Sequence, residues 1–120
     1  MRKFILITAF LLPMLAHAAD PWSATDKALG VTAATALAID WRQTQMIAEN
    51  PARWRELNPI LGSHPTIAAV NRHFAFNALL IGVIANYLPS TYRKAYLGAV
   101  SVVEFSCAGH NYKMGLKIAF

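Results

Sequence analysis

Apolar residues gather in three long segments of this chain, which run from Ala28 to Ala48, from Ile67 to Leu88 and from Tyr92 to about Gly109. Each segment is close to the ~20 residues that a helix needs to cross the hydrocarbon core of a bilayer. Proline, glycine and asparagine lie between the segments, as they do at helix ends. The pattern predicts an all-α protein whose three helices form an antiparallel, transmembrane bundle.

The boundaries of the predicted helices are marked by residues that stop or cap helices. The Asn-Pro pair at 50–51 ends the first helix, and "PARWREL" then predicts a short helix with its proline in the first turn. Ser63 or Thr66 is expected to cap the second helix. The Pro-Ser pair at 89–90 is expected to stop the second helix and cap the third. "NPILGSHP", with its two prolines, predicts a loop.

The N-terminus has the three-part pattern of a secretory signal peptide. It has a basic start, an apolar core from Phe4 to Leu15 that is short for a spanning helix, and an Ala-His-Ala end. We predict a signal peptide at 1–18, cleaved after Ala18 or Ala19. The remaining 19–120 are predicted to form a single helical membrane domain.

Composition points to lipid as the environment of this domain. The chain is 56% hydrophobic and only 14% charged, whereas about 25% of residues are charged in soluble domains. Its basic residues are scattered and form no run, so nucleic-acid binding is not expected. The single cysteine, Cys107, excludes an internal disulfide framework.

The distribution of charge predicts an orientation in the inner membrane. An exported N-terminus places the first helix running inward, the second outward and the third inward. The inner side then carries five basic residues: Arg42, Arg53, Arg55, Lys113 and Lys117. The outer side carries Lys27, Arg93 and Lys94. This asymmetry agrees with the excess of basic residues in cytoplasmic loops.

The last nine residues, "YKMGLKIAF", have a different period. Apolar and polar side chains alternate from Tyr112 to Phe120, which is typical of a strand. A closed barrel needs at least eight strands, and the rest of the chain has helical character. The segment is therefore predicted to be a short amphipathic tail or strand.

Four stretches, "DWRQTQMIAENP", "ELNPILGSHP", "VNRHF" and "HNYKMGLKIAF", carry a resemblance to known sequences. The chain resembles an uncharacterised family of small exported or membrane-embedded bacterial and phage-encoded proteins with a D-W-x-Q-T and E-x-N-P-I-L-G-x-H-P pattern. The resemblance covers most of the chain after residue 19. It implies a location in the cell envelope and no activity, substrate or catalytic residue.

Metal binding and catalysis have little support in the sequence. His64, His73 and His110 have no partner at the i,i+4 spacing of a zinc-binding helix. Ser63-His64 and Ser101 with Glu104 supply nucleophile and acid types without a recognisable spacing. We therefore expect no metal, no cofactor and no enzymatic activity.

Polar residues inside the apolar segments are the candidate site. If the first and third helices begin at the same surface, Asp40 and Glu104 lie at one depth, near Asn77 and His73 of the second helix. A carboxylate in hydrocarbon needs a partner, so Asp40 is predicted to meet Glu104, His73 or Asn77. The candidate intramembrane cluster comprises Asp40, Thr44, Arg72, His73, Asn77 and Glu104. A second candidate set lies in the loop motif: Glu56, Asn58, Pro59, Gly62, His64 and Pro65.

Two functions remain open from the sequence. The first is a small integral membrane protein that acts through helix association and protein contacts, including a phage-linked role in lysis or exclusion. Its partners would be the bilayer and either further copies of the chain or another envelope protein. The alternatives are a periplasmic helical binding module and an outer-membrane-associated protein that uses its C-terminal strand.

Overall fold

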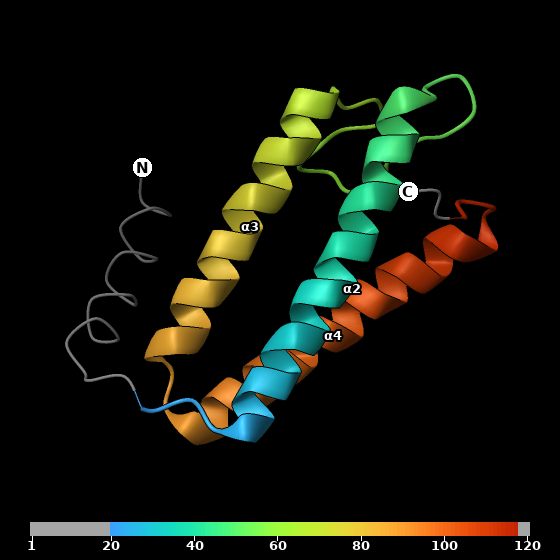
Figure 1. Ribbon diagram of the computed structural model, residues 1–120. Helices are drawn as coiled ribbons and strands as arrows, with labels where there is room; N and C mark the ends of the chain where they lie inside the picture. Colours follow the sequence, from blue (N-terminus) through green and yellow to red (C-terminus); the bar gives the residue numbers. More distant parts are fainter. Residues whose placement is uncertain (1–19, 118–120) are drawn as a thin grey trace.

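The structure is a computed structural model that describes residues 20–117. The predicted signal peptide, its cleavage site and the last three residues lie outside the described residues. The chain forms three helices, α2 (Ala24–Glu49), α3 (Ile67–Tyr87) and α4 (Ser90–Lys113). Figure 1 shows α3 beside α2, with α4 crossing behind α2. The all-α prediction is confirmed, since 20–117 contain these three helices and no strand.

Helix α2 begins four residues earlier than predicted because Ser23 and Asp26 form a capping box. The backbone N–H of Asp26 donates to Oγ of Ser23 at 3.0 Å, and the backbone N–H of Ser23 donates to Oδ2 of Asp26 at 3.0 Å. The two reciprocal bonds satisfy N–H groups that have no partner within the helix. For α3, Thr66 is the cap, and its Oγ1 accepts from the N–H of Ala69 at 3.1 Å.

Helix α4 starts differently from the prediction. Its first residue is Ser90, the N-cap position is Pro89, and no side chain at that position makes a capping bond. The N–H of Ser90 instead donates to the carboxylate of Asp20 at 2.9 Å, from the other end of the described chain. The expected capping role of Ser90 is wrong, and a distant carboxylate serves in its place.

The alternating tail is not a strand where the structure describes it. Helix α4 continues through Lys113 and closes with a Schellman turn, in which Gly115 has a φ of +100°. The N–H of Leu116 donates to the carbonyl of Asn111 at 3.0 Å, and that of Gly115 to the carbonyl of Tyr112 at 3.0 Å. Of the two forms expected for this segment, the strand is wrong at 112–117, because these residues complete a helix end that buries Leu116.

The short helix predicted after Pro51 is also wrong. The N–H groups of Arg53 and Trp54 both donate to the carbonyl of Asn50 at 3.0 Å, which closes one turn. The chain then continues to Thr66 without further helix. Residues 50–66 connect α2 to α3, and we call this end of the molecule the loop end.

Helix α2 is the centre of the packing. It packs extensively against α4 and less against α3, while α3 and α4 touch little. Near the start of α2, Ala33 packs with Ala85 of α3 and Leu97 of α4. Towards the loop end, Leu37 packs with Val70 and Phe74 of α3, the two bulkier of the three α3 residues that are buried. Most of the α3 surface is therefore exposed.

Candidate functional site

A cleft of about 480 Å³ lies near the loop end of the molecule. Its lining residues come from α2, α4 and the 50–66 connection, with Phe74 from α3. Eight of its eleven lining residues have polar or ionisable side chains: Asp40, Thr44, Glu56, Asn58, Ser106, Cys107, His110 and Asn111. Leu57, Leu61 and Phe74 supply the apolar part. The volume lies within the range of small-ligand sites.

Asp40 is held in this cleft by a network of side-chain amides. Nδ2 of Asn111 donates to Oδ1 of Asp40 at 3.3 Å and to Oε1 of Gln43 at 3.2 Å. Gln43 is fully buried, and its Nε2 donates to the carbonyls of Ala108 at 3.1 Å and Leu116 at 3.4 Å. Because this chain of bonds crosses from α2 to α4, it fixes the register between the two helices.

Glu104 of α4 is the second acid near Asp40. Its Oε2 is buried and has no donor within the described 20–117. Thr44, one turn after Asp40, is buried and donates its hydroxyl to the carbonyl of Asp40 at 2.8 Å. The structure thus brings together Asp40, Thr44 and Glu104 of the predicted cluster.

The other three members lie elsewhere. Nδ2 of Asn77 and Nε2 of His73 are 3.0 Å apart, and Nδ2 of Asn58 lies 3.4 Å from the same nitrogen of His73. This second polar group joins α3 to the loop instead of meeting Asp40. Arg72 is exposed on α3 and does not line the cleft.

The loop motif is largely folded onto itself. Oε1 of Glu56 accepts from the N–H groups of Leu57 at 3.1 Å and Asn58 at 2.9 Å. Asn58 in turn accepts at Oδ1 from Ile60 at 2.9 Å, and Gly62 adopts a φ of +79°. Four residues of the motif do not line the cleft: Pro59, Gly62 and His64 are exposed, and Pro65 is buried. Glu56 and Asn58 are therefore the motif residues that reach the cleft.

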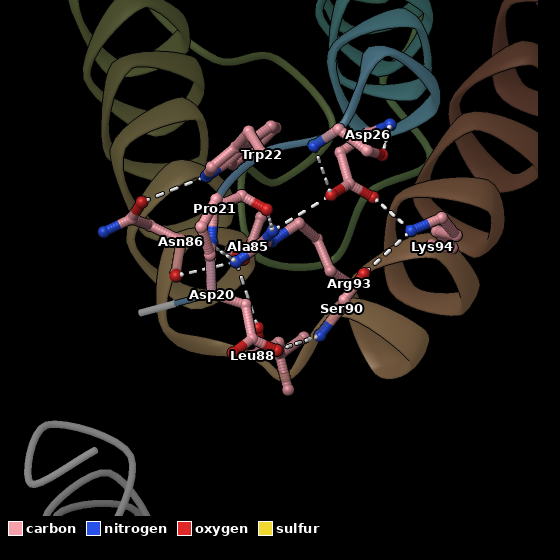
Figure 2. Close-up of polar contacts among 11 residues, drawn as sticks. Asp20, Pro21, Trp22, Asp26, Ala85, Asn86, Leu88, Ser90, Arg93 and Lys94 are labelled. Carbon is pink, nitrogen blue, oxygen red and sulfur yellow. Dashed lines mark hydrogen bonds and ion pairs between the residues drawn. The ribbon is translucent and has the colours of Figure 1, made fainter. Parts of the chain in front are cut away.

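A buried cluster around Arg93 ties the three helices together at the opposite end, which we call the Arg93 end (Figure 2). Arg93 is fully buried, and its Nη1 lies 3.0 Å from Oδ2 of Asp26. Its guanidinium also donates, at 2.7–3.3 Å, to the backbone carbonyls of Asp20, Pro21, Ala85, Asn86 and Leu88. The ring of Trp22 stacks on it at 4.8 Å, and the indole N–H donates to Oδ1 of Asn86 at 3.1 Å. A single side chain thus joins the starts of α2 and α4 to the end of α3.

Asp26 carries the negative charge of this cluster. Nζ of Lys94 lies 2.9 Å from its Oδ1, and Arg93 reaches its Oδ2. Lys94, with the backbone N–H of Ser23 and the guanidinium of Arg93, holds the pKa of Asp26 well below its usual range. The carboxylate therefore stays ionised in the folded protein in acid that protonates it in the unfolded chain.

Acidification is expected to destabilise the protein through Asp26. A lowered folded-state pKa contributes stability that is complete above the ordinary value of 3.8 and is lost as pH falls below it. The midpoint temperature of thermal unfolding, followed by circular dichroism, should decrease as the pH is lowered below about 4. Asp26→Asn should show a smaller fall, and Glu49→Gln, which alters a half-exposed pair with Arg42, should match the wild type. Equal acid dependence in wild type and Asp26→Asn would contradict this assignment.

Sequence reasoning placed Arg93 among the outer basic residues and missed the cluster. One signal was present, because Ser23 and Asp26 have the spacing of a capping box. A second signal was the cation itself, since a positive charge in the first turn of a helix is unfavourable unless a partner offsets it.

The surface between the two ends carries no exposed charge. We call this surface the belt; it comprises 28–41 of α2, 73–88 of α3 and its C-cap, and 95–109 of α4. The only Asp, Glu, Lys or Arg residues in these stretches are Asp40 and Glu104, and both are partly buried. Large apolar side chains of the belt are exposed instead: Val31, Phe76, Leu79, Val83, Val102, Val103 and Phe105. At 1.5 Å per residue, each stretch is about 21–24 Å long.

Among the helices of residues 20–117, α3 is the one that is long and apolar enough to cross a membrane, and little of it is buried. No group of three His, Cys, Asp or Glu among residues 20–117 is arranged to hold a metal ion. Comparisons with protein-family models, with curated proteins and with solved structures find no match to this chain. The family resemblance seen in the sequence stays a prediction.

Proposed function

We propose that the protein is a small integral membrane protein of the cell envelope, which acts through helix association and contacts with other proteins. The observation that carries the proposal is the belt, which places exposed apolar side chains on all three helices at one level. A soluble domain of this size would expose charged residues along its helices. The belt is shorter than the ~30 Å hydrocarbon core, and long side chains such as Arg42 and Arg72 at its edge can extend to the interface.

Hydroxyl groups on the exposed surface support this proposal. The hydroxyls of Thr32, Thr35 and Ser106 donate to the carbonyls of the residues four positions earlier, at 2.6–2.8 Å. In lipid a polar group has no water partner, so an internal bond of this kind is needed. These exposed hydroxyls of α2 and α4 therefore need no water partner, because each donates to a backbone carbonyl of its own helix.

The distribution of charge supports an inner-membrane orientation with the loop end in the cytoplasm. The basic residues of the loop end are Arg42, Arg53, Arg55, Arg72, Lys113 and Lys117. Those of the Arg93 end are Lys27, Arg93 and Lys94, and the last two are bound to Asp26. Cytoplasmic loops carry the excess of Lys and Arg. The exported N-terminus would then lie outside, as cleavage of a signal peptide requires.

The proposed role is assembly in the membrane, with a second copy of the chain or another envelope protein as the partner. A phage-linked task in lysis or exclusion is the specific form of this role that the sequence resemblance suggests. The polar cleft at the loop end would then open towards the cytoplasm.

Alkaline carbonate extraction tests the location. The protein is expected to stay in the membrane pellet, because the exposed apolar side chains of the belt hold it there without relying on charge. Fused after Phe120, a reporter that works only in the cytoplasm should be active. A reporter that works only in the periplasm should be inactive. Release into the soluble fraction would overturn the proposal and favour a periplasmic helical module. A periplasmic reporter signal would overturn the orientation alone.

A further inference from the structure

The residues that follow the predicted cleavage site are bound to the start of α4. The backbone carbonyl of Asp20 accepts from Nη2 of Arg93 at 2.9 Å, and that of Pro21 accepts from Nη1 at 3.3 Å. The carboxylate of Asp20 accepts from the N–H of Ser90 at 2.9 Å. The ring of Trp22 lies against the same guanidinium, at 4.8 Å. Figure 2 shows these three residues gathered around one arginine side chain.

We propose that the Arg93 cluster controls removal of the signal peptide, because signal peptidase can cut the chain only while residues 20–22 are detached from Arg93. The predicted scissile bond follows residue 18 or 19, so it lies within two residues of Asp20. Cleavage adds water across this peptide bond, which leaves a carboxylate on the signal peptide and a free amino group on the remaining chain. Docking of 20–22 and cleavage exclude each other.

The exclusion follows from how a protease holds its substrate. The chain on both sides of the cut bond must enter the active site in an extended form, with its backbone free of other partners. Whether a bond is open to proteolysis therefore depends on the burial and hydrogen bonding of the backbone around it. The carbonyls of Asp20 and Pro21 are occupied by a fully buried guanidinium, so this stretch of backbone is not free in the folded protein.

Detachment of 20–22 does not require the helices to separate. When Asp20 and Pro21 leave, Arg93 keeps its bonds to the carbonyls of Ala85 and Leu88 and its ion pair with Asp26. The helices stay joined, and the opening is local. Local openings of this kind have their own free energy, which is smaller than that of global unfolding.

Trp22 is the anchor of this short segment. Its indole N–H donates to Oδ1 of Asn86 at 3.1 Å, and its ring packs against the cluster of Ala33, Ala85 and Leu97. Gly30 of α2 makes room for the ring, since a Cβ at that position would lie 3.2 Å from Cζ3 of Trp22. A larger side chain at position 30 would therefore displace Trp22 and leave the sequence around the scissile bond unchanged.

The order of events in the cell follows from this exclusion. Removal of the signal peptide has to come before 20–22 dock on α4, and a chain that folds first keeps its signal peptide. The proposal rests on the predicted signal peptide and does not require the helices to cross a bilayer. Its outcome is therefore separate from that of carbonate extraction.

Cleavage of the folded, full-length precursor tests the proposal. The precursor would be produced while signal peptidase is inhibited, purified in detergent and then incubated with the peptidase, with cleavage followed by mass spectrometry. Proteolysis follows the population of the open state, so Arg93→Met should be cleaved about tenfold faster than the wild type or more. Lys94→Met should be cleaved at close to the wild-type rate, because Lys94 makes no bond to 20–22.

A matched pair of glycine variants keeps the test independent of Arg93. Gly30→Val should also speed cleavage, because the new side chain displaces Trp22. Gly109→Val should not, because a Cβ there would meet none of the described side chains within 4 Å. Leu37→Ala, which removes a buried side chain from the other part of the core, should lower the unfolding midpoint with less effect on cleavage than Gly30→Val.

Three results would overturn the proposal. The first is a wild-type precursor that is cleaved as fast as Arg93→Met. The second is equal acceleration by Gly30→Val and by either Gly109→Val or Leu37→Ala, which would show that cleavage does not depend on 20–22. The third is the absence of cleavage in every variant, which would show that the chain has no signal peptide for the cluster to control.

Discussion

Replacing Arg93 with methionine is expected to lower the free energy of unfolding by about 3–5 kcal/mol, the range measured when one partner of a buried ion pair is removed. Domains of this size are stable by only about 5–15 kcal/mol, so the variant should lose a large fraction of its stability and unfold at a clearly lower temperature. The large effect follows from the number of groups that depend on one guanidinium. Five backbone carbonyls and Asp26 all accept from it.

The geometry explains why no other residue can replace Arg93. The carbonyls of Ala85, Asn86 and Leu88 belong to the end of α3 and the turn after it. Those of Asp20 and Pro21 belong to the segment that leads into α2. Only a planar group with several donors can serve both sets at once. Arg93→Lys keeps the charge but has a single nitrogen, so it should recover part of the lost stability and no more.

Thermal unfolding in detergent, followed by circular dichroism, would measure these differences. Lys94→Met is the matched control, because Lys94 also pairs with Asp26 but its side chain is 38% exposed. Its effect should be smaller than that of Arg93→Met. A midpoint for Arg93→Met within a degree or two of the Lys94→Met midpoint would show that the Arg93 cluster does not hold the helices together.

The three helices could be predicted because their apolar residues and their stop signals are local features of the sequence. Their exact ends could not. Ser90 is a residue type that caps helices, yet its own N–H at the start of α4 donates to Asp20, which lies seventy residues away. The tail from Tyr112 alternates like a strand, but a Schellman turn at Gly115 closes the helix there. In both places, tertiary contacts outweighed the local pattern.

The candidate site, too, was predicted in part from local sequence and in part depended on tertiary contacts. Counting residues from the helix starts predicted that Asp40 and Glu104 share one level, and in the structure Glu104 is a near neighbour of Asp40. The same count placed His73 beside Asp40, whereas His73 binds Asn77 and Asn58. Depth along an axis follows from sequence spacing, but the direction of a side chain depends on how each helix is rotated. That rotation depends on how the helices pack against one another, which cannot be predicted from the sequence of one helix alone.

A positive charge placed at Leu79 is expected to reduce membrane insertion strongly. Leu79 lies near the middle of α3, and its side chain is 66% exposed in the belt. On the insertion scale, an arginine at the centre of a membrane helix costs roughly 2.5–3.5 kcal/mol, and the leucine it replaces is itself favourable. Leu79→Arg should therefore lower the fraction of protein found in the carbonate-resistant pellet about tenfold or more.

Leu57 provides a matched control for this prediction. It is also a leucine, and its side chain is 69% exposed, but it lies in the 50–66 connection outside the belt. Leu57→Arg should leave the pelleted fraction unchanged, because the new charge meets water at the loop end. The two substitutions have the same chemistry and nearly the same exposure, so any difference between them reports the environment of the belt. If Leu79→Arg and Leu57→Arg extract alike and both stay folded, the belt faces water and the helices do not cross a bilayer.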